Sequence, residues 1–278
     1  MIFSKYQALG NSYLVLPVDR LGMPPSESEI SRLCDRYFGV GSDGVLLGPL
    51  PSAVATYKLR IFNPDGSEAE KSGNGLRIFC RYLWDQGLVG DQLFSIETLG
   101  GVVAAQVLDS GLRVQIEMGN VSFLSTDIPI TGTLREVINE TIAVDGAEFQ
   151  FCGATVGNPH CVIPVAQASE EMARRYGPLL ECHSLFPNRT NVQFLQIIDR
   201  NNIRIEIWER GAGYTYASGS SSCAAAAVAY RLGLCDQHIA VHMRGGIIHI
   251  ALDKLFNAAM TGPVIKVCDG AVVPECFS

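Results

Sequence analysis

The feature that most constrains this 278-residue chain is an internal repeat, in which a strand, a glycine-rich turn and a helix occur twice. The first copy contains Ser72-Gly73, and the second contains Ser218-Gly219, 146 residues later. Alternating apolar segments precede both turns, and Gly87 and Gly233 end both helices at the same spacing. A strand, turn, helix and stop in one register over about 25 residues indicates a duplication, so the sequence predicts two similar lobes.

Short alternating segments around each predicted helix indicate strands. They include residues 102–108, 112–118, 192–198 and 247–252. The helix after Ser72 carries one apolar stripe, whereas the helix after Ser218 is apolar almost all round and is expected to be buried. This pattern predicts an α+β fold, in which each lobe is an antiparallel sheet or barrel wrapped on a central buried helix.

The lobe boundary is expected near Gly119, at the end of a predicted strand. The N-terminal lobe then covers residues 1–118, with 263–278 as a tail that can cross back to it, and the C-terminal lobe covers 119–262. A further helix is predicted over residues 28–38, with Tyr37 and Phe38 on its apolar face. The glycine-rich stretch 39–44 that follows is interpreted as a flexible turn rather than a ligand loop.

Composition and charge narrow the class of protein. The hydrophobic fraction of 47% is typical of a globular chain that can fill two cores. The net charge of −7 and a pI near 5.3 argue against nucleic acid as a partner. We expect no membrane span and no secretory signal, so the cytoplasm is the default location. The nine cysteines lack any C-x-x-C spacing, and most are expected to be buried thiols.

The two Ser-Gly turns also predict chemistry. A helix start presents free N–H groups and the positive end of the helix dipole, which suit a carboxylate. Glu209-Arg210 supplies one charge of each sign, as a clamp for an ammonium and a carboxylate on one small molecule. Neutral hydrogen-bonding groups come from asparagines, namely Asn11, Asn63, Asn74, Asn158 and Asn191. Each serine alone is interpreted as a helix N-cap, but the matched pair favours a functional role.

Six motifs in this order make the chain resemble the diaminopimelate epimerase family. They are Lys5-Tyr-Gln-Ala-Leu-Gly-Asn11, Gly39-Val-Gly-Ser-Asp-Gly44, Phe62-Asn-Pro-Asp-Gly-Ser67, Gly157-Asn-Pro-His-Cys161, Thr190-Asn-Val-Gln-Phe194 and Glu209-Arg-Gly-Ala-Gly213. The resemblance implies two pseudo-symmetric lobes with the active site in the cleft between them. It also implies an amino-acid substrate, no cofactor and no metal. Because the family often forms dimers, it implies a homodimer as well.

The family works by a two-base mechanism, in which one thiolate removes the α-proton of LL- or meso-diaminopimelate and a thiol on the opposite face returns one. The resemblance places these bases at Ser72 and Ser218, with His160 and Glu209 as the residues that tune them. Residues expected to hold the amino-acid end of the substrate are Asn11, Asn63, Asn158, Asn191, Glu209 and Arg210. Those expected to bind its carboxylate at the two helix starts are Gly73, Asn74, Gly219 and Ser220.

The chain departs from the family at both base positions, where the family's cysteines are replaced by Ser72 and Ser218. If the pKa of serine lay about five units above that of a thiol, forming the alkoxide would cost roughly 7 kcal/mol more. Tyr214 also stands where the family usually has glutamate, and Ser221 where glycine is common. These two changes are expected to affect how a substrate fits the site.

Three explanations of the serine pair stay open on the sequence. The serines are replacements introduced to trap a substrate, or the chain is a natural relative that acts on another amino acid by a serine-tolerant route, or catalysis is lost and the protein only binds. The superfamily includes proline racemases and hydroxyproline dehydratases, which place Ser or Thr at one catalytic position. The changes at Tyr214 and Ser221 favour natural divergence.

Three other functional classes are weaker. A serine hydrolase would use Ser72 or Ser218 as nucleophile and His160 as base, but the chain has no G-x-S-x-G elbow. A metal enzyme would draw on side chains whose spacing fits no known metal family, namely His160, Cys161, Cys182 and His183. A non-catalytic amino-acid-binding protein would bind substrate without isotope exchange.

Overall fold

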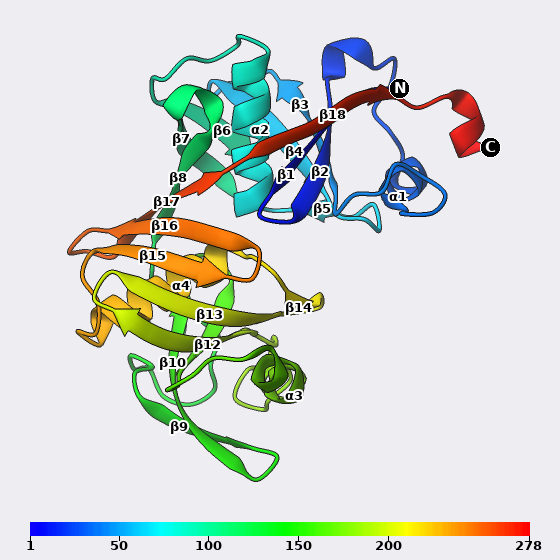
Figure 1. The fold of residues 1–278 in the computed structure, drawn as a ribbon. Helices are drawn as coiled ribbons and strands as arrows, with labels where there is room; N and C mark the ends of the chain where they lie inside the picture. Colours follow the sequence, from blue (N-terminus) through cyan, green and yellow to red (C-terminus); the bar gives the residue numbers. More distant parts are fainter. The chain divides into compact units, whose positions relative to one another are not determined.

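The computed structural model describes residues 1–278, in which the chain forms two units (Figure 1). The first unit is Met1–Glu117 together with Thr261–Ser278, and the second unit is Met118–Met260. The chain leaves the first unit within β8 (Arg113–Asn120) and returns to it within β17 (Asn257–Pro263). None of its helices is both long and apolar enough to cross a membrane.

The other elements follow in chain order within each unit. The first unit contains β1 (Ile2–Ala8), β2 (Asn11–Leu16), η1 (Val18–Arg20), α1 (Glu27–Cys34), β3 (Val45–Leu50), β4 (Tyr57–Phe62), β5 (Glu68–Ala69), α2 (Gly73–Asp85), β6 (Phe94–Thr98), β7 (Gly101–Leu108), η2 (Asp109–Gly111), β18 (Ile265–Ala271) and η3 (Pro274–Phe277). The second unit contains β9 (Glu140–Val144), β10 (Ala147–Thr155), β11 (Pro159–Pro164), α3 (Glu170–Glu181), β12 (Asn191–Asp199), β13 (Asn202–Glu209), β14 (Gly213–Thr215), α4 (Gly219–Arg231), β15 (His238–Met243) and β16 (Gly246–Leu252).

Strand pairing confirms the internal repeat. In the first unit the pairs are β1–β2, β2–β3, β3–β4, β4–β5, β4–β6 and β6–β7. In the second unit β10–β11, β11–β12, β12–β13, β13–β14, β13–β15 and β15–β16 pair in the same order. The α+β class predicted from the sequence is confirmed, since sheets dominate both units and four α-helices, two in each unit, accompany them.

The prediction of purely antiparallel sheets is wrong, because each unit contains two parallel pairs. These pairs are β2–β3 and β4–β6 in the first unit, and β11–β12 and β13–β15 in the second. Parallel neighbours require a long connection that returns the chain to the same end of the sheet. The helices supply it, since α1 lies between β2 and β3, and α2 between β4 and β6.

Helices α2 and α4 have the same length and begin in the same way. Each has 13 residues, and each follows an extended serine, Ser72 or Ser218, whose side chain accepts a hydrogen bond from the third helical N–H. Each ends shortly before a glycine with positive φ, Gly87 or Gly233. Glycine occupies this position because a positive φ is costly for other residues. The predicted burial of the second helix is confirmed, since residues 221–229 of α4 are all buried.

Helix α1 ends four residues before the sequence predicted. The carboxylate of Asp35 accepts the N–H groups of Tyr37 and Phe38, both at 2.7 Å, and this turn stops the helix after Cys34. Tyr37 and Phe38 are therefore 92% and 71% exposed and do not join its buried face. The correction leaves Ile30, Leu33 and Cys34 as the residues that α1 contributes to the core.

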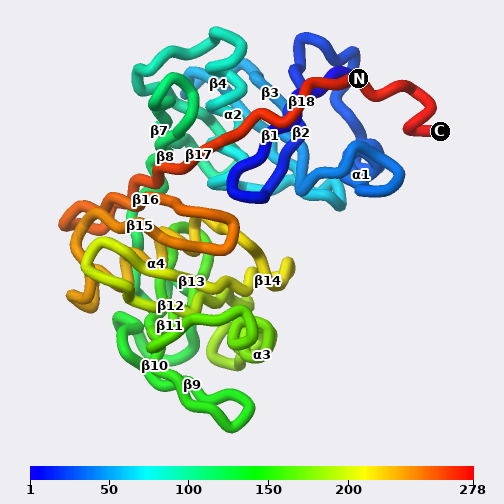
Figure 2. The backbone as a smooth tube through the Cα atoms, viewed as in Figure 1, coloured from blue at the N-terminus to red at the C-terminus, as the bar shows by residue number.

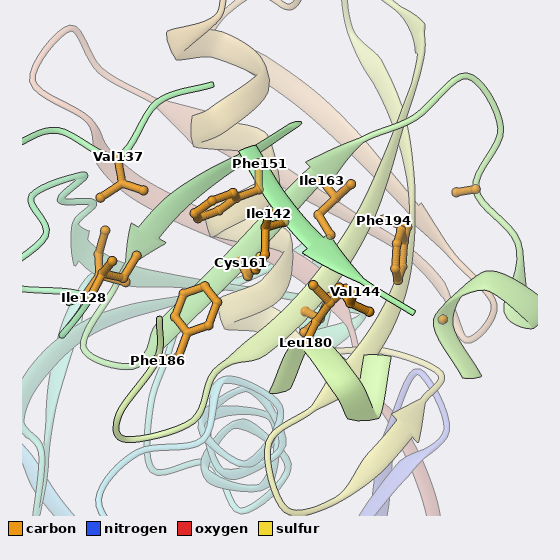
Figure 3. Packing of buried hydrophobic residues seen from close by; sticks show 14 residues of the cluster. Ile128, Val137, Ile142, Val144, Phe151, Cys161, Ile163, Leu180, Phe186 and Phe194 are labelled. Atoms are coloured by element: carbon orange, nitrogen blue, oxygen red, sulfur yellow. The ribbon is translucent and has the colours of Figure 1, made fainter. Parts of the chain in front are cut away.

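Each unit has its own apolar core. In the first unit, Leu14, Leu33, Val45 and neighbouring side chains form one buried cluster. The red C-terminal strand β18 runs antiparallel to the blue strand β1, which joins the two ends of the chain in this unit (Figure 2). In the second unit, Phe151, Phe194 and Leu180 pack between β10, β12 and α3 (Figure 3). The turns that precede α2 and α4 are thus held by separately packed scaffolds.

Candidate active site

The turn of the first unit centres on Ser72, the N-cap of α2. Its hydroxyl accepts the N–H of Gly75 at 3.0 Å. The helix starts at Gly73, which has no side chain to cover the first N–H groups. These groups and the helix dipole favour an anion at this position. Gly73 and Asn74 thus form the first turn of α2, where the sequence predicts a carboxylate to bind.

A buried polar chain orients two of the predicted asparagines. Arg77 is fully buried and donates to Asn74 Oδ1 at 2.7 Å, and Asn74 Nδ2 donates to Asn11 Oδ1 at 3.2 Å. With its oxygen engaged, Asn11 keeps its amide N–H₂ group as a donor for a ligand. The structure thus brings Asn11 and Asn74 together. Asn63 is exposed instead, and its Nδ2 donates to Ser67 Oγ at 3.0 Å across its own turn.

The turn of the second unit centres on Ser218, which is 4% exposed and caps α4. Its hydroxyl lies 3.5 Å from the N–H of Ser221, a looser cap than that of Ser72. The carboxyl of Glu209 lies beside the Ser218 hydroxyl. Burial raises the pKa of the Glu209 carboxyl, although the neighbouring Ser218 hydroxyl opposes the shift. Ser218 and Glu209 therefore form a hydroxyl–carboxyl pair that can share a proton.

His160 is fully buried on β11 and faces two side chains of its own unit. Its Nε2 lies 3.1 Å from Asn158 Oδ1. Burial lowers the pKa of His160 to about 3, and the charge of Arg210 adds to this, while the neighbouring Gln193 side chain opposes it. Gln193 also donates to Ser221 Oγ at 3.0 Å, on the first turn of α4. His160 is thus neutral and orients Asn158 from within a buried network.

Asn191 and Asn158 connect the loops around this turn. Asn191 accepts the N–H of Arg210 at 3.0 Å and donates to the carbonyl of Pro159 at 2.8 Å. Both polar groups of Asn191 are therefore engaged by backbone, which gives it a loop-joining role in addition to any contact with substrate. Asn158 Nδ2 donates to Ser220 Oγ at 3.3 Å, next to Gly219 at the start of α4.

Arg210 is an exposed residue on the loop after β13. Its Nη1 donates to the carbonyl of Asn188 at 3.0 Å. Its neighbour Glu209 is partly buried at the end of the same strand. The two residues of the predicted clamp thus lie at one strand end, with Glu209 partly buried and Arg210 exposed.

Sequence reasoning missed Glu181, the buried last residue of α3. Its carboxylate accepts Trp208 Nε1 at 2.7 Å and the N–H of Gly211 at 3.0 Å, and it pairs with Arg189. These contacts hold the loop that carries Glu209 and Arg210. The partners lie up to 30 residues away in the chain, so no local pattern marks the position.

Replacing Glu181 by alanine is expected to lower the free energy of unfolding by about 3 kcal/mol, since charged hydrogen bonds and a buried partner are lost. Burial alone would raise the pKa of Glu181, but the bonds from Arg189, Trp208 and Gly211 lower it overall. Its stabilisation is therefore present above the unfolded-state pKa and is lost as pH falls through the lower folded value. Urea unfolding at pH 7 and at pH 3 measures both effects.

Glu171→Ala is the matched control, because Glu171 is exposed on the same helix. It should change the free energy of unfolding by less than about 0.5 kcal/mol. Equal stability losses in the two variants at pH 7 would show that Glu181 does not anchor the loop.

Tyr13 is a second residue that the sequence did not indicate. Its hydroxyl oxygen lies 3.1 Å from Ser72 Oγ. Of the side chains considered for a metal site, Cys182 is exposed, whereas His160 and Cys161 are buried neighbours on β11. No group of three or more His, Cys, Asp and Glu side chains is arranged as a metal site.

Comparison with known proteins gives one family over most of the chain. A family profile described as diaminopimelate epimerase matches residues 3–124 and 152–267. A protein of Nostoc sp. named diaminopimelate epimerase 2 is 58% identical over 278 residues, which covers all of this chain and 98% of that protein. The diaminopimelate epimerase of Moorella thermoacetica is 38% identical over 275 residues, covering 97% of this chain and 98% of the relative.

Solved structures at low sequence identity share the fold. A probable proline racemase from Agrobacterium radiobacter superposes with a TM-score of 0.71 at 15% identity, covering 100% of this chain and 96% of that one. A hydroxyproline epimerase from Agrobacterium vitis gives a TM-score of 0.68 at 16% identity, covering 100% and 93% of the two chains. At these identities the likeness establishes the architecture.

Proposed function

Because the chain belongs to the diaminopimelate epimerase family and is therefore an isomerase, we propose that it inverts the configuration at the α-carbon of an amino acid without a cofactor. The proposed substrate is diaminopimelate, interconverted between its LL and meso forms. The two base positions are Ser72 in the first unit and Ser218 in the second. One accepts the α-proton and the other donates a proton to the same carbon.

The observation that carries this proposal is the matched pair of serine-capped helices. Ser72 and Ser218 cap helices of equal length in the two repeats, and each hydroxyl sits at a cluster of N–H groups. Helix starts lower the energy of negative charge, which develops on a substrate carboxylate and on a base that has lost its proton. The pair formed by Ser218 and Glu209 adds a proton acceptor in the second unit.

The remaining predicted residues bind and orient the substrate in this proposal. The N–H groups at Gly73, Asn74, Gly219 and Ser220 take a carboxylate, and Arg210 contributes a positive charge. Asn11, Asn63, Asn158 and Asn191 supply neutral hydrogen bonds. His160, which is neutral and bonded to Asn158, keeps that asparagine in one orientation.

A second candidate is epimerisation or isomerisation of a different amino acid by the same site. The observation that favours it is Tyr214 at the second turn, whose hydroxyl donates to Glu206 at 2.6 Å and whose ring lies 4.4 Å from the Arg174 guanidinium. An aromatic group held there changes the shape offered to a substrate side chain. A substrate panel separates the two candidates.

Proton exchange in deuterium oxide tests the proposed function. The chain is incubated with LL- and meso-diaminopimelate and with a panel of other amino acids, and the loss of the α-proton signal is followed by NMR. Deuterium uptake with interconversion of the LL and meso forms is the expected result. Uptake with another amino acid alone would favour the second candidate, and a covalent acyl adduct on Ser72 or Ser218 would instead indicate a hydrolase.

We also propose a homodimer formed through β18. Ile265, Val267 and Val273 project from this strand and its end, each more than half exposed, and Ile2 lies opposite Ala271 on the paired strand β1. An exposed apolar face on a sheet is a common contact surface for a second copy. Light scattering should give twice the 30.1 kDa chain mass, and Val267→Lys should give a monomer.

Leu255→Lys is the control for this change, because Leu255 is an exposed leucine of the second unit. A monomer in the unmodified chain, or dissociation by both substitutions, would contradict the proposed interface.

We keep the cytoplasm as the proposed location. All nine cysteines are free thiols and six of them are buried, which suits a reducing compartment. Recovery of the native protein only from an extracytoplasmic fraction would contradict this location.

A further inference from the structure

Ser72 has an ionisable neighbour within its own unit. The hydroxyl oxygens of Tyr13 and Ser72 are 3.1 Å apart, a distance at which either group can donate. Ser72 Oγ accepts the N–H of Gly75. Its hydroxyl proton and its second lone pair are left for the contact with Tyr13. Tyr13 lies on β2 and is 7% exposed, which places a phenol beside the capping serine in a largely dry setting.

Gly44, at the end of the glycine-rich stretch 39–44, makes room for this phenol. A Cβ atom on Gly44 would lie 2.5 Å from Tyr13 Cε1 and 2.5 Å from the carbonyl oxygen of Phe62. Both distances are far inside van der Waals contact, so only glycine fits beside the ring. The carbonyl of Gly44 also accepts the N–H of Leu14 at 3.1 Å, which binds this turn to the strand that carries Tyr13. The turn therefore serves to seat the ring.

We propose that Tyr13 is the proton partner of Ser72 in the first unit. This inference rests on the proposed function. When Ser72 Oγ takes the α-proton, its own hydroxyl proton passes to the phenolate of Tyr13, and the electron pair of the broken C–H bond stays on the substrate carbon. In the reverse direction Ser72 gives its proton to that carbon and is reprotonated by the Tyr13 phenol, which becomes the phenolate.

A phenol supplies the acidity that serine lacks. Its ordinary pKa near 10 lies only about 1.5 units above that of a thiol, whereas a serine hydroxyl is several units less acidic. In this relay the tyrosine is the group that ionises. The serine remains the group at the helix start that exchanges a proton with the substrate. In the second unit Ser218 likewise has an ionisable neighbour, the carboxyl of Glu209.

Tyr13→Phe removes one hydroxyl and keeps the ring beside Gly44. The expected result is a loss of α-proton exchange of roughly 100-fold or more, which is the range of a general acid–base partner. Tyr57→Phe is the matched control, because Tyr57 donates to a backbone carbonyl from a half-buried position of the same unit and should leave exchange unchanged.

The same substitution in a Ser72→Cys background separates a proton partner from a structural role. A thiol ionises without the phenol, so Tyr13→Phe should then cost less than roughly 3-fold. Equal losses in the serine and cysteine backgrounds, or full activity of Tyr13→Phe with serine present, would overturn the inference while the proposed function stands. Absence of exchange in both backgrounds before any change at Tyr13 would overturn the proposed function, and this inference with it.

Discussion

Replacing both Ser72 and Ser218 by cysteine is expected to raise α-proton exchange by roughly 100-fold or more. Each serine accepts an N–H at the start of a 13-residue helix, through Gly75 or Ser221. A thiol in that position has its pKa lowered by the same N–H groups and by the helix dipole, so a large fraction is thiolate at neutral pH. The larger sulfur fits the looser cap at Ser218 more readily than the shorter one at Ser72.

The substitution has a modest stability cost that the measurement must separate from the gain in rate. Cysteine is a weaker N-cap than serine, so the two changes should lower the free energy of unfolding by about 1 kcal/mol each. Exchange is therefore compared at a temperature at which urea unfolding shows every variant to be folded. The single variants Ser72→Cys and Ser218→Cys should each give only part of the gain, since two protons are transferred on different groups.

Ser169→Cys is the matched control, because Ser169 caps α3 and accepts the N–H of Met172 at 3.2 Å outside the repeated turns. It should not change the exchange rate. If the double cysteine variant gains nothing over this control, the serines do not occupy base positions of an epimerase, and a binding protein becomes the better description.

Glu209→Gln is expected to reduce exchange by roughly 10²- to 10⁴-fold, the range found when a general acid–base group is removed. Gln keeps the shape of the side chain and can still accept the Ser218 hydroxyl, but it cannot take its proton. Because burial raises the pKa of Glu209, the acid limb of the wild-type pH profile should lie above pH 4.3, the ordinary value for glutamate. This limb should be absent from the variant.

The stability of Glu209→Gln should move in the opposite direction from its activity. A carboxyl whose folded pKa is raised stabilises the fold below its unfolded value, and that contribution is lost as pH rises through the folded one. At pH 7 the neutral glutamine removes a desolvated charge, so the melting temperature should stay equal or rise. Glu171→Gln, at an exposed position of α3, is the control and should retain exchange. A parallel fall in activity and stability in Glu209→Gln would indicate a structural role instead.

The repeat made much of this architecture predictable from the sequence. The spacing between Ser72 and Ser218 placed two helix starts correctly, and the four named alternating segments match β7, β8, β12 and β16 within two residues. The parallel pairs were missed because alternation shows which residues are buried and says nothing of strand direction. The end of α1 was missed because the side chain of Asp35 competes with the helix for backbone N–H groups.

The site was less predictable than the fold, because the arrangement of its side chains depends on contacts between residues that are distant in the sequence. The motifs indicated the asparagines, but the chain from Arg77 through Asn74 to Asn11 depends on a buried guanidinium. Glu181 and Tyr13 carry no local signal, since their partners come from other elements. The lowered pKa of His160 likewise follows from its burial, which the sequence does not state.

Each capping hydroxyl accepts a helix N–H and is also the proposed base. These two roles affect how a ligand binds. While Ser72 Oγ holds the N–H of Gly75, the first turn of α2 is closed upon itself. When that hydroxyl rotates towards a substrate, the amide is released and its hydrogen becomes available to an incoming anion. In the proposed reaction a substrate carboxylate would therefore replace Ser72 Oγ as the acceptor of this N–H, so that binding the anion and freeing the hydroxyl to act as a base are one coupled event.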